Sequence, residues 1–391
     1  MADEKELKEL LKQLKDHRLA SGIKAEEVDA ALGIGEGWTE AFEGGDPIPE
    51  LPVLTRLLKV LDVEPGGFFT HLDVTKMTAT VPRSFAWKLV EGEGLRFQFP
   101  YGRYKAIYTL ANASTEQAEQ VVSILRRGLA LSASGKQEES RRALMNAVSD
   151  SFLKAIELWP TANPSDIWWF VIYRAFCDPF NHPAKNRSLD FEQSWKRTGG
   201  WAFEDILQRH YGPTLHAHGI VIRLANQEKN LPGVLAKFNL DGRQEADKVD
   251  LLLLGLHDGV EEPFGVVHVK ASFAERRTDD IPLSESLVAK GYCSPLCTLD
   301  AKSKPHSKPV NRGELGPLLD QKKDKRSAKR KDIEEGRFSA GFSYNANTLP
   351  TPEEQNAKGN VVVCNFANPV DAFSRYVISF WEQFKTGRLG Q

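Results

Sequence analysis

The chain has 391 residues, of which 41% are hydrophobic, and its formal net charge at pH 7 is −2. This length allows two or three domains with hydrophobic cores, and the composition is that of an ordinary globular protein rather than a disordered one. The near-zero charge excludes a chain that is basic throughout, so any signal for nucleic-acid binding must be local. Apolar runs such as Leu251 to Leu254 are far too short to span a bilayer, and the charged N-terminal segment lacks the apolar stretch of a signal peptide. We therefore expect a soluble, cytoplasmic protein without membrane contact.

Residues 1–75 are predicted to form an all-helical domain. Leucines near the N-terminus recur at the spacing of one helix face, at Leu7, Leu10, Leu11 and Leu14. Further helical patterns cover 25–32, 35–43 and 51–61, and Gly33 is placed to end the second helix. In its order of helices, this segment resembles the helix-turn-helix domain of Cro/C1-type repressors.

The helix that this resemblance would place in the DNA major groove is GEGWTEAFEGG. It carries Glu36, Glu40 and Glu43 and has no Arg, Lys, Gln or Asn. A recognition helix normally needs donors for base edges and no acidic face toward the phosphates. We therefore expect a helical module whose recognition helix does not itself read DNA, with sequence-specific binding by this domain as the alternative.

The rest of the chain alternates between helical and strand-like patterns. Residues 76–160 are predicted to be connecting strands and helices packed on a core, with strands at 95–99 and 103–110 and helices at 114–133 and 137–158. The apolar segment 168–177 predicts a buried helix. Residues 161–391 mix strands and helices in the manner of an α/β core, with helices at 201–211 and 370–384 and strands within 216–226, 249–256, 265–271 and 360–365.

The chemically informative pair is Asp250 and Lys270. Asp250 comes directly before the apolar run Leu251–Leu254, and Lys270 comes near the end of the next apolar strand, 266–269. Adjacent antiparallel strands would bring the two side chains to the same end of a sheet. A carboxylate there can hold a divalent metal that lowers the pKa of its water, and a lysine can stabilise the charge that grows on a phosphate.

This arrangement is similar to that of the PD-(D/E)xK nucleases, in which a strand-leading Asp is followed by Asp/Glu-x-Lys on the next strand. The resemblance implies an α/β (α+β) restriction-endonuclease-like core, with a mixed sheet flanked by helices, beside the helical N-terminal domain. One position departs from the pattern, because His268 stands where the second acid is expected. The replacement acid could be Glu204, on the helix before the core, or the pair Glu245 and Asp247 just upstream of Asp250.

A second resemblance lies just past Lys270, in the segment AERRTDD. Restriction enzymes of the CCGG/CCNGG family carry an Arg-(Asp/Glu)-Arg cluster there, and Glu275 and Arg276 match it while Ala274 does not. Arg can donate to guanine and Glu can accept from cytosine, so one Glu-Arg pair can read a C·G step. Arg277, or Asp279 and Asp280, could substitute for the missing first Arg.

Together these resemblances imply a type II restriction enzyme that cuts double-stranded DNA with Mg²⁺ and leaves 5′-phosphates. The implied metal ligands are Glu204, Asp247 and Asp250, with Glu245 and Lys270 completing the catalytic set and with the choice between the two aspartates left open. Glu275, Arg276 and Arg277 would read bases. A homodimer is expected on a near-palindromic site, and a DNA methyltransferase is expected as a functional companion rather than in a complex.

A basic tract at 302–331 gives a local charge signal on an otherwise neutral chain. It holds eleven Lys or Arg residues against three acids, which suits contact with phosphates. The residues predicted to touch the DNA backbone are Ser272, Lys322, Lys323, Lys325, Arg326, Lys329 and Arg330. A solvated loop or a localisation signal would account for the same tract.

Other functions use the same features differently. A transcriptional regulator with an inactive nuclease-like domain would bind DNA and tolerate the loss of Lys270, and His268 in place of an acid favours such inactivity. A non-specific repair nuclease would keep the metal site but would have no need of Glu275 and Arg276. That pair favours the sequence-specific enzyme.

Overall fold

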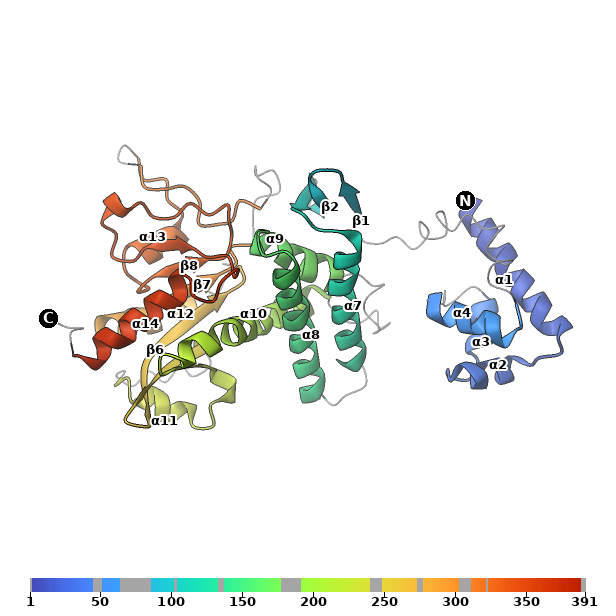
Figure 1. The fold of residues 1–391 in the computed structure, drawn as a ribbon, viewed down its shortest axis with the longest axis horizontal. Coiled ribbons are helices and arrows are strands. Elements are labelled where there is room, and N and C mark those ends of the chain that lie inside the picture. The colour runs from blue at the N-terminus through green and yellow to red at the C-terminus, as the bar shows by residue number, and fades with distance from the viewer. Residues whose placement is uncertain are drawn as a thin grey trace. The chain divides into compact units, whose positions relative to one another are not determined.

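The computed structural model describes residues 2–44, 51–63, 86–101, 104–132, 137–176, 191–239, 248–272, 277–301, 311–320 and 323–387. The chain divides into two compact units, Met1–Pro82 and Arg83–Gln391 (Figure 1). The predicted boundaries at 75 and 76 lie outside the described residues. Within the described ranges, no helix has the length and apolar character needed to cross a membrane.

Unit 1 is helical, as predicted. Its described helices are α1 (Ala2–Ala20), α2 (Ala25–Leu32), α3 (Trp38–Glu43) and α4 (Leu51–Val60). They enclose a core of leucines together with Val28 and Phe42. Gly33 ends α2 with a left-handed backbone, φ 66°, which places its N–H on the carbonyls of Asp29 and Ala30.

Two polar contacts organise the helices of unit 1. Asp29 accepts hydrogen bonds from the backbone N–H groups of Gly37 and Thr39, each at 2.8 Å, and from the Thr39 hydroxyl. Arg18 of α1 binds both carboxylate oxygens of Glu43, at 2.5 and 2.9 Å. Glu43 of the candidate recognition helix is therefore held by α1, while the expectation that this helix does not itself read DNA stays a prediction.

Unit 2 contains two sheets. The strands β1 (Ala86–Val90), β2 (Gly94–Tyr101) and β3 (Tyr104–Leu110) form an antiparallel sheet. The larger sheet has the order β4-β5-β6-β7-β8-β9, comprising Ile220–Leu224, Leu251–His257, Val260–Lys270, Leu296–Thr298, Gly341–Ser343 and Val361–Val363. Strands β4 to β6 pair antiparallel and β6 to β9 pair parallel, which confirms the predicted mixed sheet.

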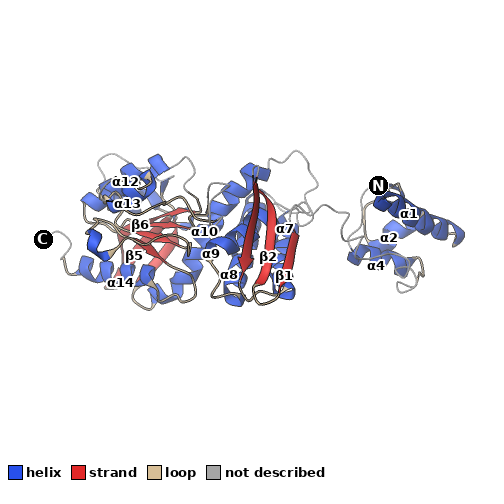
Figure 2. Ribbon diagram, turned by 90° about the horizontal axis from the view of Figure 1, so that it is seen from above, coloured by secondary structure: helices blue, strands red, loops and turns tan. Residues whose placement is uncertain are grey.

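Helices pack on both faces of this larger sheet (Figure 2). The longer helices of unit 2 are α7 (Thr115–Ser132), α8 (Gln137–Leu158), α10 (Phe191–His216), α12 (Arg277–Ala289) and α14 (Ala372–Lys385). Of these, α10, α12 and α14 pack on the larger sheet, whereas α7 packs on α8 and on the π-helix. The shorter ones are α9 (Pro164–Trp168), α11 (Leu231–Ala236), α13 (Ala328–Glu334), the 3-10 turns Ala225–Gln227 and Glu353–Gln355, and a π-helix, Trp169–Phe176.

The apolar run of β5 is explained by burial on both sides. Leu251 and Leu253 pack in the core that includes α10 and α14, and Leu252 and Leu254 pack in the core against α11 and α12. Alternate residues of a strand point to opposite faces, so a strand covered on both faces is apolar throughout. Polar residues can therefore lie only beyond the apolar stretch, at the end of the sheet where β5 begins and β6 ends.

Candidate active site

Asp250 and Lys270 meet at one end of the sheet, as predicted. Asp250 immediately precedes β5 and Lys270 ends β6, and the two strands run antiparallel with Leu251 opposite Val267. Lys270 Nζ lies 3.5 Å from Asp250 Oδ2, and the backbone N–H of Val269 donates to the same oxygen at 2.7 Å. The carboxylate is thus held both by the strand and by the lysine.

A third residue joins this pair from the following helix. Asp280, in the first turns of α12, is buried and places Oδ2 2.8 Å from Lys270 Nζ. The sequence pattern offers Asp280 only as a substitute in base reading, so this position differs from the predicted one. A signal for it is nevertheless present, because Asp280 stands at the head of the buried stripe Leu283, Ser284 and Leu287, which has the i, i+3, i+4, i+7 spacing of one helix face.

His268, at the strand position where the PD-(D/E)xK pattern has an acid, is fully buried. Its Nε2 lies 3.1 Å from the Ser294 hydroxyl, which in turn lies 2.8 Å from the hydroxyl of Ser284 on α12. Burial, with a smaller contribution from the charge of Lys270, lowers the pKa of His268 to about 3, so the ring is neutral at ordinary pH. The contacts from His268 through Ser294 to Ser284 therefore link β6 to α12, one helical turn after Asp280.

Glu204, on α10, belongs to the same electrostatic cluster. Burial and the negative charge of Asp250 raise the pKa of Glu204 to about 8, against the opposing charges of Lys270 and Arg141. Burial alone would lower the pKa of Lys270, but the charges of Asp250 and Asp280 outweigh it and raise that pKa. We refer to Glu204, Asp250, Asp280 and Lys270 as the carboxylate cluster.

Several predicted site residues lie outside the described residues, namely Glu245, Asp247, Glu275, Arg276 and Lys322. Ser272 is half-buried just after β6, and Arg277 begins α12. Their predicted roles in catalysis and DNA contact stay predictions.

Part of the basic tract is engaged in internal bonds. Arg330 is fully buried and donates to the Glu334 carboxylate at 2.9 Å and to the Leu349 carbonyl at 2.6 Å. Arg326 pairs with Asp324 and Glu334, and Lys329 pairs with Glu314. Of the predicted backbone contacts in this tract, Lys323 and Lys325 are exposed. These internal hydrogen bonds explain why the charged side chain of Arg330 is buried.

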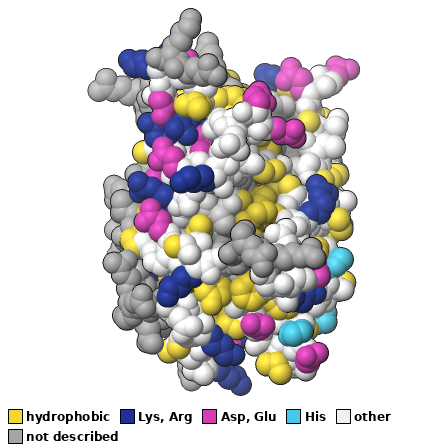
Figure 3. Space-filling model, turned by 90° about the vertical axis from the view of Figure 1, so that its left-hand side faces the viewer, with side chains coloured by type: hydrophobic (Ala, Val, Ile, Leu, Met, Phe, Trp, Pro, Cys, Tyr) yellow, Lys and Arg dark blue, Asp and Glu magenta, His cyan; other side chains and the backbone are white. Residues whose placement is uncertain are grey.

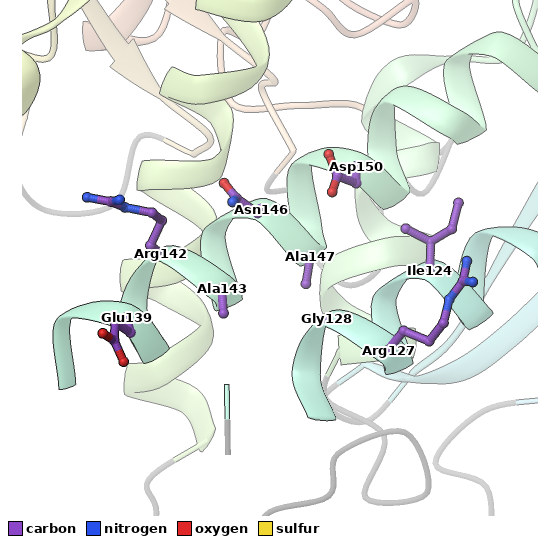
Figure 4. A pocket seen from close by; sticks show the side chains of 9 residues that line it. All are labelled: Ile124, Arg127, Gly128, Glu139, Arg142, Ala143, Asn146, Ala147 and Asp150. Carbon is purple, nitrogen blue, oxygen red and sulfur yellow. The ribbon is translucent and has the colours of Figure 1, made fainter. Parts of the chain in front are cut away.

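A cavity of about 720 Å³ lies elsewhere in unit 2, between α7 and α8 (Figure 4). It is lined by Ile124, Arg127, Gly128, Glu139, Arg142, Ala143, Asn146, Ala147 and Asp150. No member of the carboxylate cluster lines it, so this hollow and the cluster are separate features.

The carboxylate cluster has the donors that a hard divalent cation requires. Among the described residues, no group of three or more His, Cys, Asp and Glu side chains is gathered closely enough to hold a metal ion, and Lys270 Nζ contacts both aspartates. Burial is the main cause of the raised pKa of Glu204, and the charge of Asp250 adds to it. Carboxylate oxygens suit Mg²⁺ by donor type, but the described side chains are not gathered into a site that would hold the ion without rearrangement.

Carboxylates and a lysine, gathered where β5 begins and β6 ends, are groups that can support metal-assisted hydrolysis of a phosphodiester. No protein-family model matches the chain. The chain is 39% identical over 244 residues to the type II restriction enzyme AgeI of Thalassovita gelatinovora, a match that covers 60% of this chain and 83% of that enzyme. The crystal structure of an AgeI–DNA complex is similar with a TM-score of 0.60 at 34% identity, covering 73% of this chain and 99% of that one. The chain therefore belongs to the type II restriction enzymes, which are site-specific deoxyribonucleases.

Proposed function

We propose that this enzyme binds double-stranded DNA and hydrolyses its phosphodiester bonds with Mg²⁺ at the carboxylate cluster, leaving 5′-phosphates. The observation that carries this proposal is the contact of Lys270 with both Asp250 and Asp280, at 3.5 and 2.8 Å. It is supported by the similarity to AgeI, whose crystal structure is a DNA complex. A CCGG-type core in the recognition site is proposed from Glu275 and Arg276.

Each member of the carboxylate cluster has a role that follows from its position. Asp250, Asp280 and Glu204 would hold Mg²⁺, with Asp247 as the further candidate upstream of β5. When bound, Mg²⁺ supplies a water of lowered pKa and stabilises negative charge on the phosphate. Lys270 stays a cation beside the two aspartates, so it acts on the phosphate by charge and hydrogen bonding.

A two-fold symmetric arrangement is proposed for the working enzyme. A palindromic duplex presents two scissile phosphates related by a two-fold axis, and each needs its own carboxylate cluster. We therefore propose a homodimer on DNA, and a cognate methyltransferase that protects the host site. Light scattering gives the molar mass of the protein with and without a DNA duplex, and so tests the proposed homodimer.

Cleavage of phage or plasmid DNA tests the proposed reaction. We expect discrete fragments with Mg²⁺ and intact DNA with EDTA, and sequencing of the fragment ends gives the site and the terminal phosphate. Lys270→Ala removes the cation next to the reacting phosphate, and Asp280→Asn removes a carboxylate that would hold Mg²⁺ and that pairs with Lys270. Each should therefore lower the cleavage rate by at least about 10²-fold.

Matched controls separate these effects from a general change of charge. Lys88→Ala removes an exposed lysine of β1, and Glu285→Gln removes an exposed acid of α12, so both should cleave as the wild type does. A smear of random fragments would favour the repair-type nuclease. Intact DNA under every condition, with binding retained, would favour a regulator with an inactive nuclease-like domain.

A further inference from the structure

An arginine on α8 lies next to the carboxylate cluster without belonging to it. The guanidinium carbon of Arg141 is 3.6 Å from the centre of the Trp201 ring, so the cation stacks on the ring face. Trp201, on α10, precedes Glu204 by three residues, and residues at this spacing are neighbours on one helix surface. Stacking therefore holds Arg141 close to the acid of α10.

Helices α8 and α10 pack on one another, so the stacked Arg141 lies on the side of α8 that faces α10, the helix that carries Glu204. In the described parts of the chain, no carboxylate forms an ion pair with Arg141, and the side chain is exposed. Arg141 is thus a second cation at the cluster, and it is open to solvent where Lys270 is largely enclosed.

We propose that Arg141 is a docking residue for a DNA backbone phosphate at the rim of the active site, an inference that rests on the proposed function. A guanidinium stacked by its face keeps its N–H donors in the plane, where they can bind two phosphate oxygens at once. Trp201 fixes that plane in advance, which reduces the ordering cost of binding. The ionised carboxylates of the cluster repel a polyanion, and a cation at their rim offsets this repulsion.

The chain offers a matched control for this residue. Arg142 follows Arg141 in α8 and is also exposed, but it lines the cavity between α7 and α8 (Figure 4). The two variants Arg141→Ala and Arg142→Ala therefore remove the same charge from adjacent positions of one helix. A phosphate contact by Arg141 predicts different results for them, whereas a general effect of charge predicts the same result.

The test measures binding of the full-length protein to a fluorescent DNA duplex in EDTA, by anisotropy, over a series of salt concentrations. We expect Arg141→Ala to weaken binding about tenfold and to reduce the slope of log K against log salt by about one, because one phosphate contact is lost. Arg141→Lys should keep the slope and lose affinity, since lysine keeps the charge but not the planar fork. Arg142→Ala should bind as the wild type does.

The outcomes distinguish this inference from the proposed function. Wild-type affinity and slope in Arg141→Ala, or equal losses in both alanine variants, would overturn the docking role while cleavage by the wild type stands. If the wild type binds the duplex but never cleaves it, hydrolysis fails and the binding comparison still decides the role of Arg141. Should Arg141→Ala unfold, Arg141→Gln retains a planar group on Trp201, and an unchanged slope in that folded variant is equally decisive against the contact.

Discussion

Two aspartates outside the carboxylate cluster hold polar segments of unit 2 together. Asn311 donates to Asp166 at 2.8 Å, and the Thr348 hydroxyl donates to Asp300 at 2.8 Å. Burial raises the pKa of each aspartate to about 7, although these hydrogen bonds act in the opposite direction. Both carboxyl groups therefore favour the protonated form in the folded protein at pH values where an exposed aspartate is ionised.

Asp166→Asn should change the pH dependence of stability. The wild-type pKa of about 7 lies above the ordinary value of 3.8, so the folded state binds the proton more tightly than the unfolded state. The contribution of Asp166 to stability is then fully present below about pH 4 and is lost as pH rises toward 7, by up to about 4 kcal/mol. Urea unfolding of both proteins from pH 5 to 8 measures this, and the variant should gain on the wild type as pH rises. If the free energies of unfolding of the two proteins changed in parallel with pH, the raised pKa of Asp166 would be contradicted.

At the scale of single residues, the sequence predicted the pairing of Asp250 with Lys270 but not the contact of Asp280 with that lysine. Asp250 and Lys270 could be paired because both flank apolar strands, and strand register follows from local pattern. Asp280 could not be assigned to the lysine, because its role depends on how α12 packs against β6. The same limit applies to Arg330, whose charge suggested DNA contact but whose side chain is buried against Glu334.

At the scale of elements, β5 and α14 pack so closely that one position has no room for a side chain. A Cβ added at Gly255 of β5 would lie 2.2 Å from a ring carbon of Trp381, a fully buried residue of α14. The tryptophan also packs on Phe264 of β6 at 5.0 Å between ring centres. The glycine therefore sets how closely α14 approaches the sheet.

Gly255→Ala should destabilise unit 2 by about 1–3 kcal/mol, because the methyl group forces the Trp381 ring away from the sheet. Thermal unfolding followed by tryptophan fluorescence measures the change. Gly212→Ala is the matched control, since a Cβ in α10 at that position meets nothing within 4 Å. That variant should be neutral or slightly stabilised, as alanine is the better helix former. Equal melting of the two variants would show that the ring can move freely.

Most elements of the core could be predicted from periodicity. The helices at 115–132, 137–158 and 372–385 and the strands β4 and β5 fall where apolar spacing placed them. Strand β6 was predicted from Gly265 but begins at Val260, in a polar stretch that was predicted as a turn. The segment 168–177 was predicted as a buried helix, and its described part is helical, with Trp168 to Ile172 and Ala175 buried. The π-helical hydrogen bonding of Trp169–Phe176 was not predicted, because apolar spacing does not distinguish a π-helix from an α-helix.

At the scale of the whole molecule, 51 Lys and Arg residues are nearly balanced by 53 Asp and Glu residues. On the face shown in Figure 3, basic and acidic side chains lie interspersed. Because the chain has no net positive charge, its DNA affinity would depend on local basic groups. The similar AgeI structure covers 73% of this chain and nearly all of its own, so about a quarter of this chain has no counterpart there.

Asp29→Ala should unfold unit 1 selectively. It removes the acceptor for Gly37 and Thr39 and leaves buried donors unpaired, at a cost of about 2 kcal/mol or more. Calorimetry should show a shifted transition for unit 1 and an unshifted one for unit 2. DNA cleavage should persist, since the carboxylate cluster lies wholly in unit 2. Loss of cleavage with unit 2 still folded would instead give unit 1 a direct part in the reaction.

The acid found on α12, rather than on β6, has a mechanical consequence. The three carboxylates of the cluster come from α10, from the start of β5 and from α12, so no two of them share an element. If a divalent cation binds there, as proposed, it would act as a cross-link between three segments distant in sequence. It would stabilise unit 2 by mass action, about 2.7 kcal/mol at a hundred times its dissociation constant, and leave unit 1 unaffected. The metal ion proposed for the reaction would thus also stabilise the folded state of unit 2.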